Sequence, residues 1–211
     1  MINYLFYSED YCKFCLEEKL NSYICDNCIE RLEFIDGSKI LENGNCYYPL
    51  FYNNYIKNII KKYKYEDSTY LVKPLAEILY KFYLSKGLDY EYISFVPMIN
   101  KDEFVRGYNQ SYLLAKELSE YLDIELIDLV EKIRVTKDQN KIDRFERKKN
   151  LENSFRVYKN LDIDNKKILI IDDLVTTGAT FDTIAKEIKS VYDVEISLLA
   201  ISSSKIDTDY Q

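Results

Sequence analysis

Hydrophobic and polar positions follow two periodicities along most of the chain. Short apolar runs predict strands, at 47–52, 92–96, 167–171 and 194–201. Apolar residues spaced three and four apart predict helices, over 56–63, 74–82, 114–122 and 181–191. The run at 167–171 has few polar interruptions, which is typical of a strand buried at the centre of a parallel sheet. The alternation of strands and helices predicts an α/β fold with a doubly wound parallel sheet.

Cysteine spacing sets the pattern of the first 45 residues. Two CxxC pairs, separated by nine residues, are formed by Cys12, Cys15, Cys25 and Cys28. Two such pairs can supply a tetrahedral tetrathiolate zinc site, which is closed and therefore structural. The alternative is a set of small buried thiols. We therefore predict a zinc-binding module over 1–45 and a second domain over 46–211, with Cys46 in the core of that domain.

Composition and charge narrow the function. The 211 residues carry a net charge of −7, so any contact with nucleic acid requires a local basic patch. The chain contains no histidine, which excludes histidine-based triads and histidine metal ligands. We find neither a signal peptide nor an apolar run of about 18 residues, so we expect a cytoplasmic protein with reduced thiols and no membrane insertion.

The strongest chemical signal is the segment 168–180. A buried strand leads to Asp172 and Asp173, and a loop of small hydroxyl residues around Gly178 connects them to a helix. Ligands of open α/β sheets bind beyond the carboxyl ends of strands, and backbone N–H groups in such a loop favour a phosphate. Carboxylates suit hydroxyl donors, so the segment predicts a ribose-5-phosphate site. The alternative for the two acids is a stabilising pair at a helix N-terminus.

This segment resembles the phosphoribosyl pyrophosphate (PRPP) binding loop of type I phosphoribosyltransferases. Together with the cysteine pairs, the chain resembles the ComF family of competence proteins, which join a cysteine zinc module to a phosphoribosyltransferase-like domain. Further matching motifs are Lys61–Tyr65, Val96-Pro97 and the Arg-Gly-Tyr-Asn-Gln run at 106–110. A spaced set also matches, namely Thr136, Gln139, Arg144, Arg147 and Asn150.

The resemblance implies roles for individual residues. Asp172 and Asp173 would hold the ribose 2′ and 3′ hydroxyls, and Arg106 would bind the leaving pyrophosphate, which Pro97 would help to line. The 5′-phosphate loop would comprise Val175, Thr176, Thr177, Gly178, Ala179 and Thr180. Mg²⁺ would bridge pyrophosphate and ribose oxygens. For 106–110, a turn followed by a polar helix start is the alternative interpretation.

The resemblance also implies a role in DNA uptake during natural transformation, with PRPP as ligand and an acceptor that the sequence does not identify. Two other functions stay open. One is a noncatalytic single-stranded DNA-binding or adaptor protein on the same fold, working with other competence proteins such as a helicase. The other is an ordinary base-salvage phosphoribosyltransferase, for which we identify no base pocket.

Two basic stretches bear on the DNA hypothesis. Residues 131–150, which include Lys132–Lys149, hold eight basic and four acidic residues, and Lys57–Lys64 forms a second cluster. Such charge can close over pyrophosphate or contact single-stranded DNA, with Phe145 stacking on a base. A solvated helix is the third interpretation.

Overall fold

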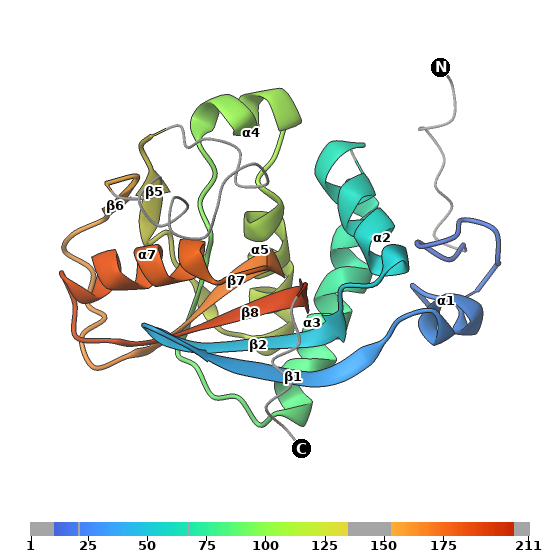
Figure 1. Ribbon diagram of the computed structural model, residues 1–211, viewed down its shortest axis with the longest axis horizontal. Coiled ribbons are helices and arrows are strands. Elements are labelled where there is room, and N and C mark those ends of the chain that lie inside the picture. Colours follow the sequence, from blue (N-terminus) through green and yellow to red (C-terminus); the bar gives the residue numbers. More distant parts are fainter. Residues whose placement is uncertain (1–10, 21, 67, 135–152, 205–211) are drawn as a thin grey trace.

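The computed structural model describes residues 11–20, 22–66, 68–134 and 153–204. In these residues, six strands form the main sheet in the order β1-β2-β8-β7-β3-β4 (Figure 1). Their bounds are β1 Phe34–Leu41, β2 Gly44–Phe51, β3 Tyr92–Phe95, β4 Glu125–Leu126, β7 Lys167–Val175 and β8 Glu195–Ser203. A separate antiparallel pair consists of β5 Val130–Lys132 and β6 Phe155–Val157.

The main sheet is parallel except at one edge. β2, β8, β7, β3 and β4 run parallel to their neighbours, whereas β1 pairs antiparallel with β2. An antiparallel edge strand on a parallel sheet is common in α/β folds. Because β1 lies before residue 45, the main sheet begins inside the segment that the sequence assigned to the zinc module.

Helices cover both faces of the sheet (Figure 1). One face packs against α2 Asn54–Tyr65, α3 Val72–Ser85 and α5 Gln110–Leu122, and the other packs against α7 Ala179–Lys189. Shorter elements are α1 Asp26–Glu30, the 3₁₀ helix η1 Thr69–Leu71 and α4 Asn100–Arg106. This arrangement confirms the predicted doubly wound α/β fold. None of the described helices is both long and apolar enough to cross a membrane.

Local sequence explains where the main helices begin. Asn53 and Asn109 cap α2 and α5, because each side-chain oxygen accepts hydrogen bonds from the first free backbone N–H groups. Pro74 lies in the first turn of α3, where its missing N–H costs no hydrogen bond. The helix and strand predictions for these segments are correct to within a few residues at each end.

The central strand β7 has buried side chains on both faces. Leu169 and Ile171 pack against α2, α3 and α5, whereas Ile168 and Ile170 face α7. The cysteine-rich segment joins the first of these two cores, since Cys12, Phe14 and Cys25 are buried together with residues of α2 and α3. Cys46 is fully buried in the second core, as predicted.

Candidate functional site

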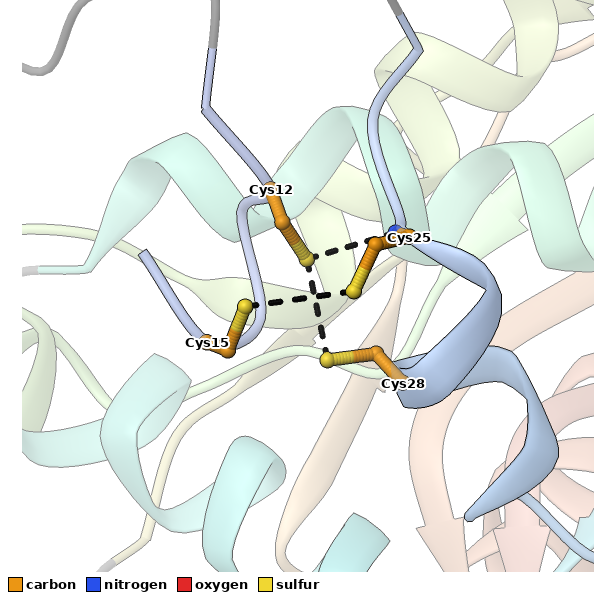
Figure 2. Close-up of side chains that lie close together, drawn as sticks. All are labelled: Cys12, Cys15, Cys25 and Cys28. Atoms are coloured by element: carbon orange, nitrogen blue, oxygen red, sulfur yellow. Dashed lines mark hydrogen bonds between the residues drawn. The ribbon is translucent and has the colours of Figure 1, made fainter. Parts of the chain in front are cut away.

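The four predicted zinc ligands form one compact cluster. Cys12, Cys15, Cys25 and Cys28 converge from the loop before α1 and from α1 itself (Figure 2), with their sulfurs within 4.8 Å of one another. The Cys12–Cys28 and Cys15–Cys25 sulfur distances are 3.7 and 3.9 Å, and all four cysteines are free. Tetrahedral zinc with bonds of about 2.3 Å requires sulfurs about 3.8 Å apart. The geometry is therefore that of a structural zinc site.

Two further features of the cluster fit a thiolate-bound cation. Burial opposes ionisation of Cys12, but backbone N–H groups of Cys15, Cys25 and Phe14 outweigh it and lower the pKa of Cys12 to about 7. The Tyr55 hydroxyl is buried beside Cys28. Burial raises the pKa of the Cys28 thiol, whereas the neighbouring Tyr55 hydroxyl favours its thiolate form. Tyr55 is therefore placed as an outer-shell donor to a metal-bound Cys28 thiolate.

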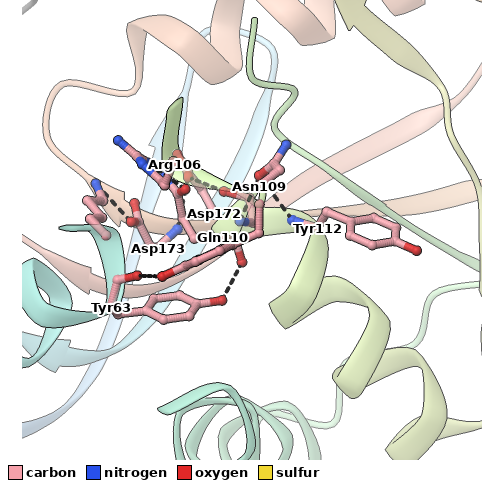
Figure 3. Close-up of polar contacts among 10 residues, drawn as sticks. Tyr63, Arg106, Asn109, Gln110, Tyr112, Asp172 and Asp173 are labelled. Atoms are coloured by element: carbon pink, nitrogen blue, oxygen red, sulfur yellow. Dashed lines mark hydrogen bonds and ion pairs between the residues drawn. The ribbon is translucent and has the colours of Figure 1, made fainter. Parts of the chain in front are cut away.

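The second site lies at the carboxyl end of β7, far from the cysteines in sequence. It is adjacent to the last turn of α2 (Figure 3). Asp173 continues the row of Leu169 and Ile171 that faces α2, and it is only 2% exposed. Its Oδ2 forms a 2.8 Å ion pair with Lys64 Nζ. A nearly buried carboxylate is thus neutralised by a lysine from another element.

Asp172 has different partners from Asp173. Its Oδ1 accepts hydrogen bonds from Ser111 Oγ and from the backbone N–H of Asp173, both at 2.9 Å. Burial, and then the neighbouring Asp173 carboxylate, raise the pKa of Asp172 to about 7. Burial opposes the charge on Lys64, but the Asp173 carboxylate outweighs it and raises the pKa of Lys64. The pair therefore combines one salt-bridged carboxylate with one that is close to its titration point at neutral pH.

The loop after β7 turns sharply into α7. Gly178 adopts φ +82°, a left-handed conformation that favours glycine, and an added Cβ would lie 2.7 Å from the Leu41 side chain. The Thr177 hydroxyl accepts a hydrogen bond from Ala179 N–H, and Lys39 Nζ donates to the Thr176 carbonyl. This loop therefore presents backbone N–H groups and hydroxyls beside Asp172 and Asp173, on a backbone path that favours glycine at 178.

The motif at 106–110 connects α4 to α5 and faces the same strand end (Figure 3). Gly107 ends α4 with φ +85°, and Asn109 caps α5 while its Nδ2 donates to the Val96 carbonyl at 3.2 Å. Arg106 is half-buried, donates to Gln110 Oε1 at 2.5 Å, and lies 5.0 Å from the Tyr65 ring centre. The guanidinium is therefore held near the end of α2.

The structure brings most of the predicted site residues to one edge of the sheet. Asp172, Asp173 and the loop over 175–180 are contiguous, and the 106–110 motif and the buried Pro97 come from the β3 side. Sequence reasoning missed Ser111, Lys39 and the pairing of Lys64 with Asp173, because no local pattern marks a partner from a distant element. Within the matched set, Thr136, Gln139, Arg144, Arg147 and Asn150 fall outside the described residues, as does Phe145.

Two cavities lie away from these aspartates, around α3 and the cysteine-rich segment. One, of about 690 Å³, is lined by residues of α1, β1 and α3, including Ile29, Phe34 and Phe82. The other, of about 1300 Å³, includes Tyr23 and Tyr121. Neither includes a predicted PRPP-site residue, so the phosphoribosyl hypothesis rests on side-chain chemistry at the strand ends rather than on cavity size.

Comparison with known proteins finds relatives in sequence and in structure. A family model described as "Phosphoribosyl transferase domain" matches residues 108–206. Competence protein F of Haemophilus influenzae is 29% identical over 202 residues, covering 91% of this chain and 84% of that protein. Competence protein ComFC of Streptococcus pneumoniae is 30% identical over 182 residues, covering 84% and 74%. A solved adenine phosphoribosyltransferase aligns with a TM-score of 0.42 at 15% identity, covering 63% of this chain and 69% of that chain.

The fold and the family model define a phosphoribosyltransferase-like α/β protein with an N-terminal four-cysteine cluster. Similarity along most of its length to two competence proteins places it more narrowly. The chain belongs to the competence protein F family.

Proposed function

We propose that this protein binds PRPP with Mg²⁺ at the carboxyl end of β7 and acts in DNA uptake during natural transformation. The observation that carries the proposal is the joint placement of Asp172 and Asp173 with the Thr-Thr-Gly-x-Thr loop. Carboxylates that accept hydrogen bonds from sugar hydroxyls thereby lie beside loop groups that donate hydrogen bonds to a phosphate. A sugar phosphate requires both at one strand end. The pathway assignment draws on the two competence relatives.

In this proposal each residue of the site binds a different part of the ligand. Asp172 and Asp173 accept hydrogen bonds from the ribose 2′ and 3′ hydroxyls, and the loop over 175–180 binds the 5′-phosphate. Arg106 binds the pyrophosphate, since a guanidinium can contact phosphate oxygens in a bidentate manner. Mg²⁺, a hard cation that prefers oxygen ligands, would be held beside the carboxylates and neutralise the pyrophosphate.

Catalysis by this site would depend on positioning and charge. As pyrophosphate leaves, the anomeric carbon of PRPP develops positive charge, which carboxylates at the ribose stabilise. A rigid strand end that fixes the sugar lowers the entropy cost of reaching that state. We propose phosphoribosyltransferase-type activity toward an acceptor that pyrophosphate release in the presence of candidate acceptors would identify.

At the four-cysteine cluster we propose one structural zinc ion. The sulfur separations of 3.7 and 3.9 Å and the Tyr55 hydroxyl beside the Cys28 sulfur support this assignment. All four ligand positions would be filled by thiolates, so the ion would stabilise the fold and take no part in phosphoribosyl transfer.

Calorimetric titration of PRPP, with and without Mg²⁺, tests the proposal. We expect a single binding event that requires Mg²⁺ and that Arg106→Ala weakens about tenfold, since a charge-assisted contact contributes about 1.5–3 kcal/mol. Pyrophosphate release with a panel of free bases then separates the alternatives. Rapid release with one base would favour ordinary base salvage, and PRPP binding without release would exclude the tested bases as acceptors.

Single-stranded DNA binding is a second candidate function. Lys57 and Lys61 are exposed on α2, whereas Lys64 of the same cluster is paired with Asp173, so only part of the cluster faces solvent. DNA binding would release counterions, and its affinity should fall steeply as salt is raised. Absence of binding to a labelled oligonucleotide even at low salt would reject this candidate.

A further inference from the structure

Helix α2 contacts both of the sites described above, one at each end. Its 12 residues span about 18 Å at 1.5 Å per residue. Its first turn adjoins the cysteine-rich segment through Tyr55, and its last turn adjoins the aspartates of β7 (Figure 3). The contacts at each end decide whether the two sites can act independently.

At the first turn, α2 is fastened to the cysteine-rich segment. Asn53, the capping residue, donates from Nδ2 to the Arg31 carbonyl at 3.1 Å and to Glu33 Oε1 at 2.9 Å. The Arg31 guanidinium lies 4.0 Å from the centre of the Tyr55 ring, and Phe14 contacts the same ring edge-on at 6.3 Å between centroids. Phe14 lies between Cys12 and Cys15 in the sequence, so the cysteine cluster positions a residue that packs against Tyr55.

At the last turn, α2 is fastened to the phosphoribosyl site. Lys64 pairs with Asp173 at 2.8 Å, and the Tyr63 hydroxyl donates to the Gln110 carbonyl at 2.7 Å. The Tyr108 hydroxyl in turn donates to the Tyr63 carbonyl. The final residues of α2 are thus bonded to β7 and to the 106–110 motif, which provide the proposed ribose and pyrophosphate contacts.

Between its two ends α2 has little freedom to absorb a shift. Its inward side chains are all buried in the core, and they are Ile56, Ile59, Ile60 and Tyr63. A close-packed helix moves as a unit, because its side chains interlock with those of the neighbouring strands and helices. A displacement of Tyr55 therefore moves Lys64, nine residues along the same helix.

We infer that α2 couples the two sites: the metal-loaded four-cysteine cluster fixes Tyr55, and through α2 it positions Lys64 to hold Asp173 for the sugar phosphate. Lys64 is thus a positioning residue of the phosphoribosyl site rather than only a surface charge of a basic cluster. This inference rests on the proposed function, because it assumes that PRPP binds at Asp173. Loss of zinc should then weaken PRPP binding without any contact between the ligand and the cysteines.

A double-mutant cycle on zinc-loaded protein tests the coupling. PRPP affinity with Mg²⁺ is measured by calorimetry for wild type, Tyr55→Ala, Lys64→Gln and the double variant, with zinc content and far-UV circular dichroism recorded for each. We expect Tyr55→Ala to keep its zinc and to weaken PRPP binding about fivefold or more, a typical size for coupling between sites. The double variant should bind no more weakly than Lys64→Gln alone, because Tyr55 acts through Lys64.

Two exposed residues serve as controls for the substitutions in this cycle. Tyr158→Ala and Lys116→Gln make the same chemical changes at exposed positions and should leave PRPP affinity unchanged. If Tyr55→Ala does not fold, Arg31→Ala replaces it in the cycle, since it removes the side chain whose guanidinium lies over the ring and leaves the ring in place. Unchanged PRPP affinity in Tyr55→Ala, or in Arg31→Ala where it takes that place, would overturn the inference. Additive losses of affinity in the double variant would also overturn it. Failure of wild type to bind PRPP would instead reject the proposed function.

Discussion

At the scale of single residues, Asp172 and Asp173 differ in what compensates their charge. Asp173 is paired with Lys64, whereas Asp172 receives only neutral donors, from Ser111 and from the backbone. The charged form of Asp172 is therefore costly in the free protein, and hydroxyl groups of a ligand would offset that cost. This difference has a consequence for stability that can be measured without any ligand.

We expect Asp172→Asn to stabilise the folded protein above neutral pH. The pKa of Asp172 is raised from 3.8 to about 7, so the folded state binds this proton more tightly than the unfolded chain. The stability that the proton provides is fully present below about pH 4 and is lost as pH rises through about 7. The asparagine oxygen can keep both hydrogen bonds to Ser111 and the backbone. A shift of this size corresponds to at most about 4 kcal/mol, so we expect a gain of at least about 1 kcal/mol, or at least about 2–4 °C in Tm, at pH 8.

Thermal unfolding of both proteins from pH 3 to pH 9 checks this expectation. The difference in Tm should shrink toward zero below the unfolded-state pKa of 3.8, where the wild-type carboxyl becomes protonated in both states. A difference that stays constant with pH would show that the substitution acts through packing and not through the charge of Asp172.

Gly178 gives a second test at this scale. Gly178→Ala meets both a left-handed backbone and the Leu41 side chain 2.7 Å away, whereas Gly87→Ala meets φ +60° with nothing within 4 Å. The left-handed backbone costs each variant about 1–2 kcal/mol, so the difference between the two variants reports the contact with Leu41. We therefore expect Gly178→Ala to lower the free energy of unfolding by at least about 1 kcal/mol more than Gly87→Ala does. Equal losses in urea denaturation would argue against close contact between the loop and Leu41.

At the scale of elements, the start of α5 fixes the geometry of the site. Asn109 caps the helix through its Oδ1 and reaches the Val96 carbonyl through its Nδ2, while Ser111 in the first turn holds Asp172. The capping residue therefore links α5 to the end of β3, and Ser111 links the same helix turn to β7. Replacing Asn109 separates the capping contribution from the link to β3.

We expect Asn109→Ala to destabilise the protein by about 1–2 kcal/mol, because it removes both the cap and the hydrogen bond to Val96. Asn109→Asp keeps an oxygen for the cap and loses the donor to Val96, so its loss should be smaller. Chemical denaturation of the two variants measures the order. If the aspartate variant were the less stable one, the contact with Val96 would dominate over capping.

The same scale shows what sequence can and cannot predict. Strand β7 and the Thr-Thr-Gly-x-Thr loop are contiguous, so local hydrophobicity and spacing are enough to predict them. Strand β1 was missed because its residues 36–39 are Asp, Gly, Ser and Lys, which give an edge strand no apolar alternation. Lys64 and Ser111 reach the aspartates from other helices, and such partners are determined by packing rather than by neighbouring sequence.

At the scale of the whole molecule, the cysteine cluster is part of the main core. Cys12, Cys25 and Cys28 are buried together with side chains of α2 and α3, and β1 joins the main sheet directly after the cluster. Stability of the cluster and of the phosphoribosyltransferase-like part should therefore be linked. The division near residue 45 stays a prediction, to be tested by whether unfolding occurs in one step.

We expect Cys28→Ser to abolish stoichiometric zinc and to lower the stability of the whole chain by at least about 3 kcal/mol, or about 6–12 °C in Tm. Cys46→Ser is the matched control, since Cys46 is equally buried but lies outside the cluster. It should keep one zinc per chain. Elemental analysis and calorimetric melting distinguish the two variants, and full zinc retention by Cys28→Ser would remove the metal assignment.

The central claim is that Asp172 and Asp173 form the ribose side of a PRPP site. The most direct measurement is calorimetric titration of PRPP and Mg²⁺ into zinc-loaded wild type and into Asp172→Asn/Asp173→Asn. The control is Asp89→Asn/Asp162→Asn, which removes the same charge from exposed positions. We predict binding by wild type and the control and at least about a hundredfold loss in the site variant, since two charge-assisted contacts are removed. Equal binding by all three folded proteins, or none by wild type, would contradict the claim.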